Sequence, residues 1–338
     1  DPPPPVVVEA LARAAGLRGY PPSAGTPELR EAAAGWLARR LSVEVPASDV
    51  AACVGTKEFV ASLAHYLSLR DPTRDTVLYP AVSYPTYAMG AALAGLRAVP
   101  VPWGDAGLDL AAVGEDDARR ALLLWVNSPS NPTGALDDLA AAAHWGRERG
   151  VVVASDECYV AYTWAGGART ILSSGTEGVL AVHSASKRSN MAGARVGVYA
   201  GDPGLVGYLR AVRQHAGLMA AGPLQAAAAA AFSDDEHVQV QRAVYRGRLL
   251  LVSEALRAAG VDAPMPAGTF YLWARRGGMD GWALAQWLAE ASGIVASPGE
   301  LNGEAGSDLV RVAVVQPDER LALAASRLVA TPTPTIGR

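Results

Sequence analysis

Cysteine is scarce in this chain, which has only two, Cys53 and Cys158, among its 338 residues. Two cysteines cannot build the disulfide framework that stabilises small secreted domains, and such a shortage is typical of a reducing cytoplasm. The sequence also lacks an uninterrupted apolar run of about 20 residues, the length that a membrane-spanning helix needs. Its first residues, "DPPPPVVVEALARA", do not show the basic and then apolar order of a signal peptide. We therefore expect a cytoplasmic protein with no membrane partner.

An excess of positive charge is missing as well, because the formal net charge is -4. Binding to nucleic acid generally needs a basic surface, so no nucleic-acid partner is expected. Half of the residues are hydrophobic and 18% are charged, which is the composition of a globular rather than a disordered chain. The length exceeds what one small core organises and favours two domains.

Short apolar runs alternate with helical stretches between about residue 50 and residue 210. The runs, each flanked by Gly, Pro, Asp or Asn, are residues 76–80, 98–103, 121–129, 151–157, 179–186 and 195–202. Helical segments such as "FVASLAHYLSLR" and "DLAAAAHWGRERG" lie between them. This alternation predicts an α/β domain with a largely parallel sheet. In such sheets ligands bind outside the carboxyl ends of the strands, so the polar residues that follow the runs are the candidates for chemistry.

Three of the runs lead into residues that can carry chemistry. Asn131 lies in the turn "NSPSNPTG", Asp156 ends "VVVASD", and Lys187 follows "VLAVHSAS". Each has a simpler interpretation, since Asn beside Pro and Gly builds turns, Asp at a strand end often caps a helix, and a lone Lys usually lies in water. A lysine held at a strand end can instead act as a nucleophile when its surroundings activate it.

Further groups are expected at the same edge of the sheet. Tyr159 follows in "DECY", Arg195 opens the next run in "GARVG", and "VGTKE" places Gly55 and Thr56 at a helix start. An arginine is more often a surface charge, and a single helix start is a weak signal, although its free N–H groups favour a phosphate. Taken together, an amine, a carboxylate, an amide, a phenol and an anion cradle suit a phosphorylated pyridine aldehyde.

The motifs "NPTG", "DECY", "SASK" and "GARVG" occur in the order and spacing of the class I and II aminotransferases, which are fold-type-I enzymes of pyridoxal 5′-phosphate. The chain resembles this family from "GYPPSAGTPELREA" to "LVRVAVV". The resemblance implies an α/β fold with a large domain, built on a mostly parallel seven-stranded sheet between helices, and a smaller α+β domain. It assigns residues 1–46 to the start of the small domain and a dimer contact, 47–233 to the large cofactor-binding domain, and 234–338 to the C-terminal small domain.

The resemblance also implies a role for each site residue. Lys187 would bond covalently to the cofactor and move the substrate's α-proton. The other cofactor contacts would be Asp156 at the ring nitrogen, Asn131 and Tyr159 at the ring oxygen, Tyr84 stacked on the ring, and Ser184, Arg195 and the backbone of Gly55, Thr56 and Lys57 at the phosphate. Arg311 in "LVRVAV" would bind the substrate carboxylate, unless it is only a charge on an edge strand. Tyr20 would reach the phosphate of the neighbouring subunit's cofactor, which implies a homodimer.

Within the family, "SKRSNMAGARVG" and "AGTFYLWARRG" look most like bacterial succinyldiaminopimelate aminotransferases of lysine and cell-wall biosynthesis. That likeness implies glutamate and 2-oxoglutarate as the amino pair and N-succinyl-2-amino-6-oxopimelate as the acceptor. A polyanionic acceptor needs extra cations, for which Arg188, Arg213 and His215 are candidates. The alternatives are an aspartate-type or aromatic-type aminotransferase, a carbon–sulfur β-lyase on the same cofactor, and a non-catalytic binding protein with this fold.

Overall fold

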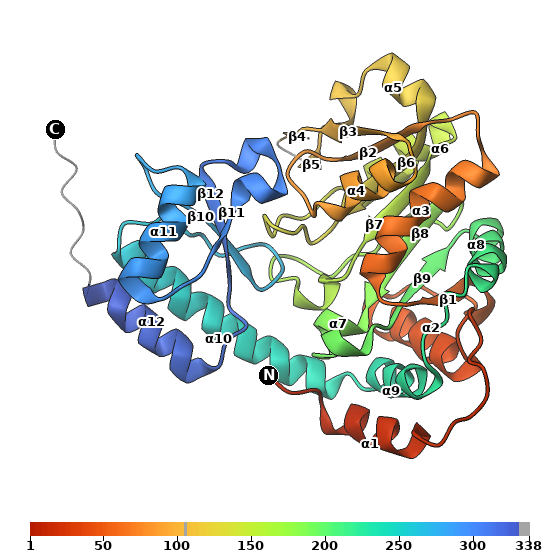
Figure 1. Cartoon of the computed structure of the whole chain (residues 1–338), viewed down its shortest axis with the longest axis horizontal. Helices are drawn as coiled ribbons and strands as arrows, with labels where there is room; N and C mark the ends of the chain where they lie inside the picture. Colours follow the sequence, from red (N-terminus) through yellow and green to blue (C-terminus); the bar gives the residue numbers. More distant parts are fainter. Residues whose placement is uncertain (105–106, 331–338) are drawn as a thin grey trace.

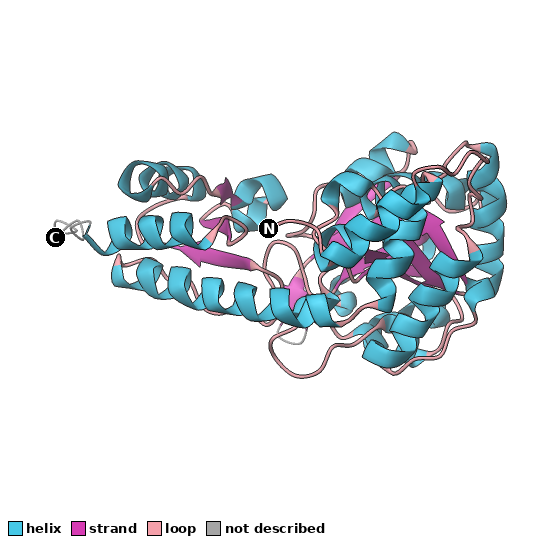
Figure 2. Ribbon diagram, turned by 90° about the horizontal axis from the view of Figure 1, so that it is seen from below, coloured by secondary structure: helices cyan, strands magenta, loops and turns pink. Residues whose placement is uncertain are grey.

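The computed structural model describes residues 1–104 and 107–330. They form a larger and a smaller body, and the long helix α10 (Glu236–Ala258) runs from one to the other (Figure 1). The larger body consists of a seven-stranded sheet with helices around it, and the smaller one contains a three-stranded sheet. Figure 2, seen from below, shows the small body extending away from the large one in the direction of this helix. No helix within the described ranges is long and apolar enough to cross a membrane.

The large sheet is mostly parallel, as predicted. In spatial order its strands are β1 (Val50–Cys53), β9 (Gly197–Gly201), β8 (Val179–Ser184), β7 (Val152–Asp156), β6 (Ala121–Asn127), β2 (Thr76–Pro80) and β3 (Arg97–Val101). The strands from β8 to β3 are parallel, whereas β9 runs antiparallel to both of its neighbours. Every residue of β6 and β8 is buried, which explains why these segments read as continuous apolar runs.

The strand β1 was not among the predicted strands, although the six predicted runs all contain one. Its sequence, "VAAC", is short and half alanine, so neither β-branched residues nor alternation marks it. Pairing with β9 fixes it at the edge of the sheet. Its place matters because the turn at Gly55 and the helix α3 (Thr56–Arg70) follow directly.

Helices cover both faces of the large sheet. One face packs against α3, α4 (Thr86–Leu93) and α8 (Pro203–His215), and the other against α2 (Pro27–Leu41), α6 (Leu139–Arg149) and α9 (Gly222–Ser233). The helix α1 (Pro5–Ala14) packs on α9, and its Val7 belongs to the same apolar cluster as α2 and α9. Residues 1–46 therefore contribute to the core beneath the large sheet, while the predicted three-part division of the chain stays a prediction.

Several short elements complete the large body. They are β4 (Trp103–Gly104) and β5 (Gly107–Leu108), which pair with each other, and the helices α5 (Glu115–Arg120) and α7 (Ala185–Arg188). The single turn of α7 directly follows β8, and the side chain of its N-cap Ser184 accepts a hydrogen bond from the backbone of Ser186. This turn is the part of the fold that carries Lys187.

The small body has its own core. Its sheet has the order β10 (Tyr271–Arg275), β12 (Leu309–Ala313) and β11 (Ser297–Pro298), and its helices are α11 (Gly281–Ser292), α12 (Asp318–Ala330) and the later turns of α10. The strands predicted from "GTFYLWARR" and "DLVRVAVV" and the helix predicted from "GWALAQWLAEAS" are confirmed. Leu256 of α10, Leu288 of α11 and Val310 of β12 are fully buried in one apolar cluster.

A loop of the small body also contacts the large body beside Tyr84. The backbone N–H of Ser83 donates to Asn302 O (2.8 Å), and Asn302 Nδ2 donates to Ser83 O (3.1 Å). Gly303 follows in a conformation with a φ of +136°, and a Cβ at this residue would collide with Ala81 O. Only glycine combines that backbone conformation with such a close approach.

Candidate active site

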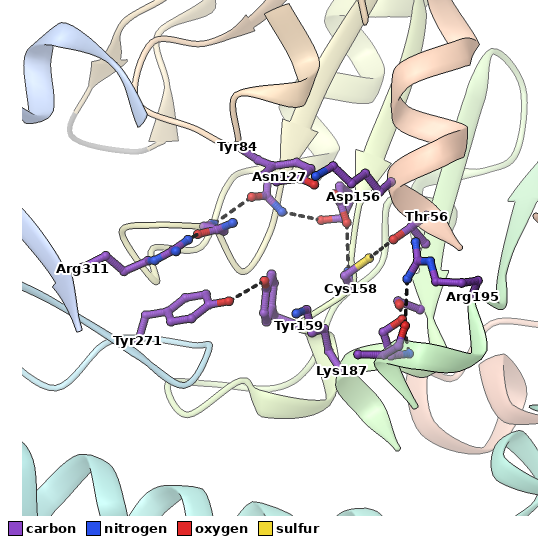
Figure 3. A pocket seen from close by; sticks show the side chains of 15 residues that line it. Thr56, Tyr84, Asn127, Asp156, Cys158, Tyr159, Lys187, Arg195, Tyr271 and Arg311 are labelled. Atoms are coloured by element: carbon purple, nitrogen blue, oxygen red, sulfur yellow. Dashed lines mark hydrogen bonds between the residues drawn. The ribbon is translucent and has the colours of Figure 1, made fainter. Parts of the chain in front are cut away.

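A cavity of about 400 Å³ opens at the carboxyl ends of β6, β7 and β8. Its lining residues are Thr56, Lys57, Tyr84, Asn127, Asn131, Asp156, Cys158, Tyr159, Ser184, Ser186, Lys187, Ala192, Arg195, Tyr271 and Arg311. Figure 3 shows the strand ends of the large body facing Arg311 and Tyr271, which come from the small body. This is the edge of a parallel sheet at which ligands are expected.

All of the predicted site residues except Gly55 and Tyr20 line this cavity. Gly55 borders it through Arg195, because a Cβ on Gly55 would collide with the guanidinium of Arg195. Tyr20 lies elsewhere, with 97% of the residue exposed in the single chain. The structure thus gathers side chains from strands and turns that are far apart in the sequence.

One end of the cavity is built to hold an anion. The helix α3 begins at Thr56 with Gly55 as its N-cap (φ +74°), and no side chain of the described residues caps its free N–H groups. Arg195, itself left-handed at φ +51°, lies against Gly55 and donates from Nη1 to Ala192 O at 3.0 Å. Ser184 and Ser186 add hydroxyl groups to the wall. A helix N-terminus beside a guanidinium is a suitable cradle for a phosphate.

Among the residues that the structure describes, Asp156 supplies the only carboxylate of the cavity wall. It is 6% exposed, its Oδ2 accepts from Tyr87 Oη (3.0 Å), and its Oδ1 accepts from the backbone of Cys158 (3.2 Å). Burial raises the pKa of Asp156 above its usual value, and the hydrogen bonds from Cys158 and Tyr87 and the charge of Lys187 oppose that rise. A carboxylate in this state is stabilised by a cationic partner, such as the protonated nitrogen of a pyridine ring.

Asn127 and Tyr271 line the cavity but were not predicted from the sequence, and neither were Cys158 and Ser186. Asn127 ends β6, accepts from the backbone of Asn131 (2.8 Å) and donates from Nδ2 to Asp156 O (2.7 Å). Its place at a strand end is a signal that could have identified it. Tyr271 lies 2.9 Å from Tyr159, hydroxyl to hydroxyl, and it comes from β10 of the small body. Only the tertiary fold brings this residue to the site.

Arg311 reaches the cavity from β12. Its Nη1 donates to Asn131 Oδ1 at 2.7 Å, and its guanidinium lies 4.6 Å from the centre of the Tyr271 ring. Its Nε is buried and has no hydrogen-bond partner in the part of the chain that the structure describes. An arginine with an unused planar edge is suited to a carboxylate, which can accept two parallel hydrogen bonds. Figure 3 shows Arg311 and Arg195 at opposite sides of the cavity.

The candidates for extra substrate-binding cations were wrong. Arg188 is 3% exposed and pairs with Asp235 (2.8 Å), and Arg213 is 1% exposed and pairs with Glu58 (2.7 Å). His215 is exposed near the end of α8, and none of the three lines the cavity. A cation next to a motif can point to either side of its strand or turn, and here the two arginines point into the protein and are neutralised there.

Comparisons with known proteins agree with this arrangement. The sequence model of the family described as "Aminotransferase class I and II" matches residues 1–328. The 4-dedimethylamino-4-oxo-anhydrotetracycline transaminase OxyQ of Streptomyces rimosus is 45% identical, covering 97% of this chain and 90% of that protein. The LL-diaminopimelate aminotransferase of Aquifex aeolicus is 35% identical, covering 91% and 82%. The structure of a probable N-succinyldiaminopimelate aminotransferase from Thermus thermophilus superposes with a TM-score of 0.86 at 34% identity, covering 97% and 91%.

Proposed function

The chain belongs to the class I and II aminotransferases, which use pyridoxal 5′-phosphate, and we propose that it transfers an amino group from glutamate to a keto acid. The favoured acceptor is N-succinyl-2-amino-6-oxopimelate, with 2-oxoglutarate as the other product. The Thermus thermophilus neighbour and the Aquifex aeolicus relative support this choice, because both are named for diaminopimelate substrates.

The observation that carries the proposal is the charge of the cavity wall. Lys57, Lys187, Arg195 and Arg311 line it, against the carboxylate of Asp156. We assign Arg195 to the cofactor phosphate and Arg311, at the other side of the cavity, to the substrate carboxylate. A small acid with a carboxylate next to its amino or keto group fits this arrangement.

When bound, pyridoxal phosphate supplies an aldehyde that bonds to an amine and a ring that withdraws electrons from the substrate's α-carbon. We assign Lys187 Nζ to the covalent bond and to the transfer of the α-proton. Asp156 would pair with the protonated ring nitrogen, and a carboxyl group whose pKa is raised by burial is one that such a cationic partner would stabilise in its charged form. Asn131 and Tyr159 would hold the ring oxygen by hydrogen bonds, and Tyr84 would lie against the ring.

The same assignment gives the phosphate to the N-terminus of α3, from Gly55 to Lys57, together with Ser184 and Arg195. The exposed Tyr20 is assigned to the cofactor phosphate of a second subunit, so we propose that the active form is a homodimer. Light scattering of the purified protein tests this point directly, since a monomer that is fully active would contradict it.

A second candidate acceptor is a polycyclic ketone. The OxyQ relative, at 45% identity, is named as a transaminase of an oxo-anhydrotetracycline. The cofactor residues would be the same in both cases, so only the acceptor distinguishes the two reactions. A carbon–sulfur β-lyase is distinguished by its products, which are pyruvate, ammonia and a thiol instead of a new amino acid and a keto acid.

The test is the visible absorption of the protein with added pyridoxal phosphate. We expect the absorbance of the covalently bound cofactor to disappear with glutamate and to return with a keto acid. Bound cofactor that is insensitive to glutamate would contradict the donor assignment, and an absence of cofactor absorbance would contradict the site itself. Product analysis with N-succinyl-2-amino-6-oxopimelate, 2-oxoglutarate and an oxo-anhydrotetracycline then identifies the acceptor.

A further inference from the structure

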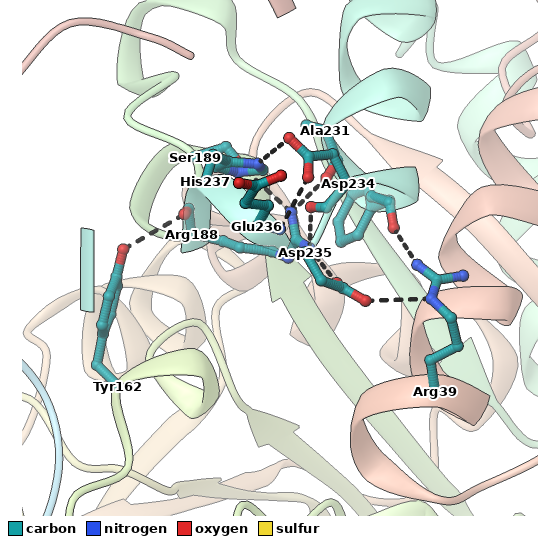
Figure 4. Close-up of polar contacts among 10 residues, drawn as sticks. Arg39, Tyr162, Arg188, Ser189, Ala231, Asp234, Asp235, Glu236 and His237 are labelled. Carbon is teal, nitrogen blue, oxygen red and sulfur yellow. Dashed lines mark hydrogen bonds and ion pairs between the residues drawn. The ribbon is translucent and has the colours of Figure 1, made fainter. Parts of the chain in front are cut away.

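The single helical turn that carries Lys187 is held from outside the cavity by the next residue, Arg188. Its guanidinium donates to Ala231 O, to Asp234 O (2.9 Å) and to Asp235 Oδ1 (2.8 Å), as Figure 4 shows. It also lies over the rings of Trp36 and Phe232, at 5.6 Å and 5.4 Å from their centres. The three acceptors belong to the segment that ends α9 and begins α10. We call residues 231–237 the α9–α10 junction.

Neighbouring residues strengthen the same connection. Ser189 Oγ lies 2.9 Å from His237 Nε2, and His237 Nδ1 lies 2.9 Å from Asp234 Oδ2. On the other side, Tyr162 Oη is within hydrogen-bond distance of Lys187 O (3.1 Å) and Arg188 O (3.3 Å). The backbone around Lys187 is therefore fixed from two directions, by Tyr162 and by the α9–α10 junction.

These contacts decide the position of the turn because it has little stability of its own. The helix α7 has only four residues, and so short a helix depends on tertiary contacts. Burial lowers the pKa of Arg188 to about 10 although Asp235 opposes that fall, so the guanidinium is charged at neutral pH. A buried charge is tolerated only where its partners stay in place, so Arg188 and the junction are held in one arrangement.

We propose that Arg188 is a positioning residue, through which the α9–α10 junction sets the place of the Lys187 amine in the cavity. The inference rests on the proposed role of Lys187. It goes beyond that role because it makes the start of α10 part of the catalytic apparatus. The later turns of α10 pack in the core of the small body, so the same contacts connect Lys187 to that body.

Two substitutions test the proposal. Arg188→Lys keeps the charge but lacks the planar fork that reaches several acceptors at once, and Arg188→Met removes the charge with a side chain of similar length. We expect both to lower kcat by about 10-fold to 100-fold, since a displacement of about 1 Å has an effect of this size. The KM for glutamate should change by less than about twofold, because Arg188 does not contact the cavity.

The second measurement does not depend on the cofactor. Hydrogen exchange of the cofactor-free protein should become about tenfold faster in residues 185–190 of the variants, while exchange in the core of the large sheet is unchanged. If Arg188→Met does not fold, Arg188→Lys still gives both measurements. Wild-type kcat and wild-type exchange in Arg188→Lys would overturn the proposal.

Arg39→Gln is the matched control. Arg39 contacts the same junction, at Asp235 Oδ2 (3.1 Å) and Phe232 O (2.8 Å), but neither of these bonds reaches α7. We expect wild-type kcat and wild-type exchange in residues 185–190 for this variant. If Arg39→Gln shows the same loss as the Arg188 variants, the loss does not depend on the bonds that Arg188 makes next to Lys187, and the assignment of Arg188 as the positioning residue is wrong. If Lys187→Ala retains turnover, the proposed function fails first, independently of Arg188.

Discussion

Adjacent residues at the ends of β7 and β8 face two different environments. Three pairs show the contrast, with the member that lines the cavity given first: Asp156 and Glu157, Ser184 and His183, Lys187 and Arg188. Successive side chains of a strand point to opposite faces, which explains the first two pairs, whereas Lys187 and Arg188 lie in the helical turn α7 that follows β8. The contrast shows that the type of residue at a strand end does not by itself indicate a site.

The side behind the cavity consists of groups that are either neutral or paired. Glu157 is fully buried, its Oε1 accepts from Ile171 N (2.8 Å), and His183 Nε2 lies 3.4 Å from its Oε2. Burial raises the pKa of Glu157 to about 8 and lowers that of His183 to about 3, so both are uncharged near neutral pH. Arg188 is charged but paired. The cavity side, in contrast, keeps its polar groups accessible to a ligand.

The strongest test of this contrast is Lys187→Ala. It removes the amine that we assign to covalent bonding and proton transfer, so turnover should fall by at least about 1,000-fold. The free energy of unfolding of the cofactor-free protein should change by less than about 1 kcal/mol, because the side chain is only partly buried. Steady-state kinetics and urea unfolding measure the two quantities. Turnover close to that of the wild type would refute the assignment.

Asp156→Asn is expected to have the next largest effect. The amide would remove the negative charge that we assign to the cofactor's ring nitrogen, so turnover should fall by about 100-fold or more. The pKa of Asp156 is raised in the fold, so the cofactor-free protein loses stability as the pH rises above the ordinary carboxyl value. An amide does not ionise, so the variant does not lose stability in this way and should be at least as stable as the wild type at pH 8. A variant that is less stable than the wild type but has normal turnover would show that Asp156 stabilises the fold and does not act on the cofactor.

Glu157→Gln, behind the cavity, should affect stability and leave turnover within about twofold. Because the pKa of Glu157 is raised from 4.5 to about 8, the folded state binds its proton more tightly, and stability falls as the pH rises through that window. The pKa of His183 is lowered from 6.5 to about 3, so this residue makes stability rise with pH below pH 6.5. From pH 6.5 to 8, where His183 no longer contributes, the ionisation of Glu157 lowers the free energy of unfolding by about 2 kcal/mol, at about 1.4 kcal/mol per pH unit.

Urea unfolding of the cofactor-free protein at pH 6.5 and pH 8 checks this prediction. The wild type should lose stability relative to Glu157→Gln over this interval, and the two stabilities should converge toward lower pH. Parallel pH profiles for the two proteins would show that Glu157 is ionised in the fold already at pH 6.5.

The sequence predicted several of the site residues that follow the strand ends, although it missed Asn127 at the end of β6. Asp156 and Lys187 each follow a buried apolar run, and the position of such runs in a parallel sheet determines the edge at which they meet. Tyr87 could not be recognised, because on α4 it looks like any core residue until its hydroxyl is seen to donate to Asp156. Tyr271 depends on how the small body is placed against the large one.

The ion-pair partners of the buried arginines could not be predicted from the sequence either. Arg188 pairs with a residue 47 positions later, and Arg213 with one 155 positions earlier. Neither partner has a spacing that marks it in advance, so an arginine beside a motif could not be assigned to the cavity or to the interior from the sequence. The roles that the family resemblance gives to Arg311 and Tyr20 stay predictions for the same reason, since each depends on a substrate or a second subunit.

The two hydrogen bonds that Ser83 and Asn302 exchange tie the small body to the large one next to Tyr84, which lines the cavity. The two bodies are also joined by α10 and by the hydrogen bond from Arg311 to Asn131. A movement that separates the two bodies at this point must break both hydrogen bonds at once, because both join the same two residues. Glycine at position 303 is needed for this contact, since a Cβ there would collide with Ala81 O and hold the two bodies apart.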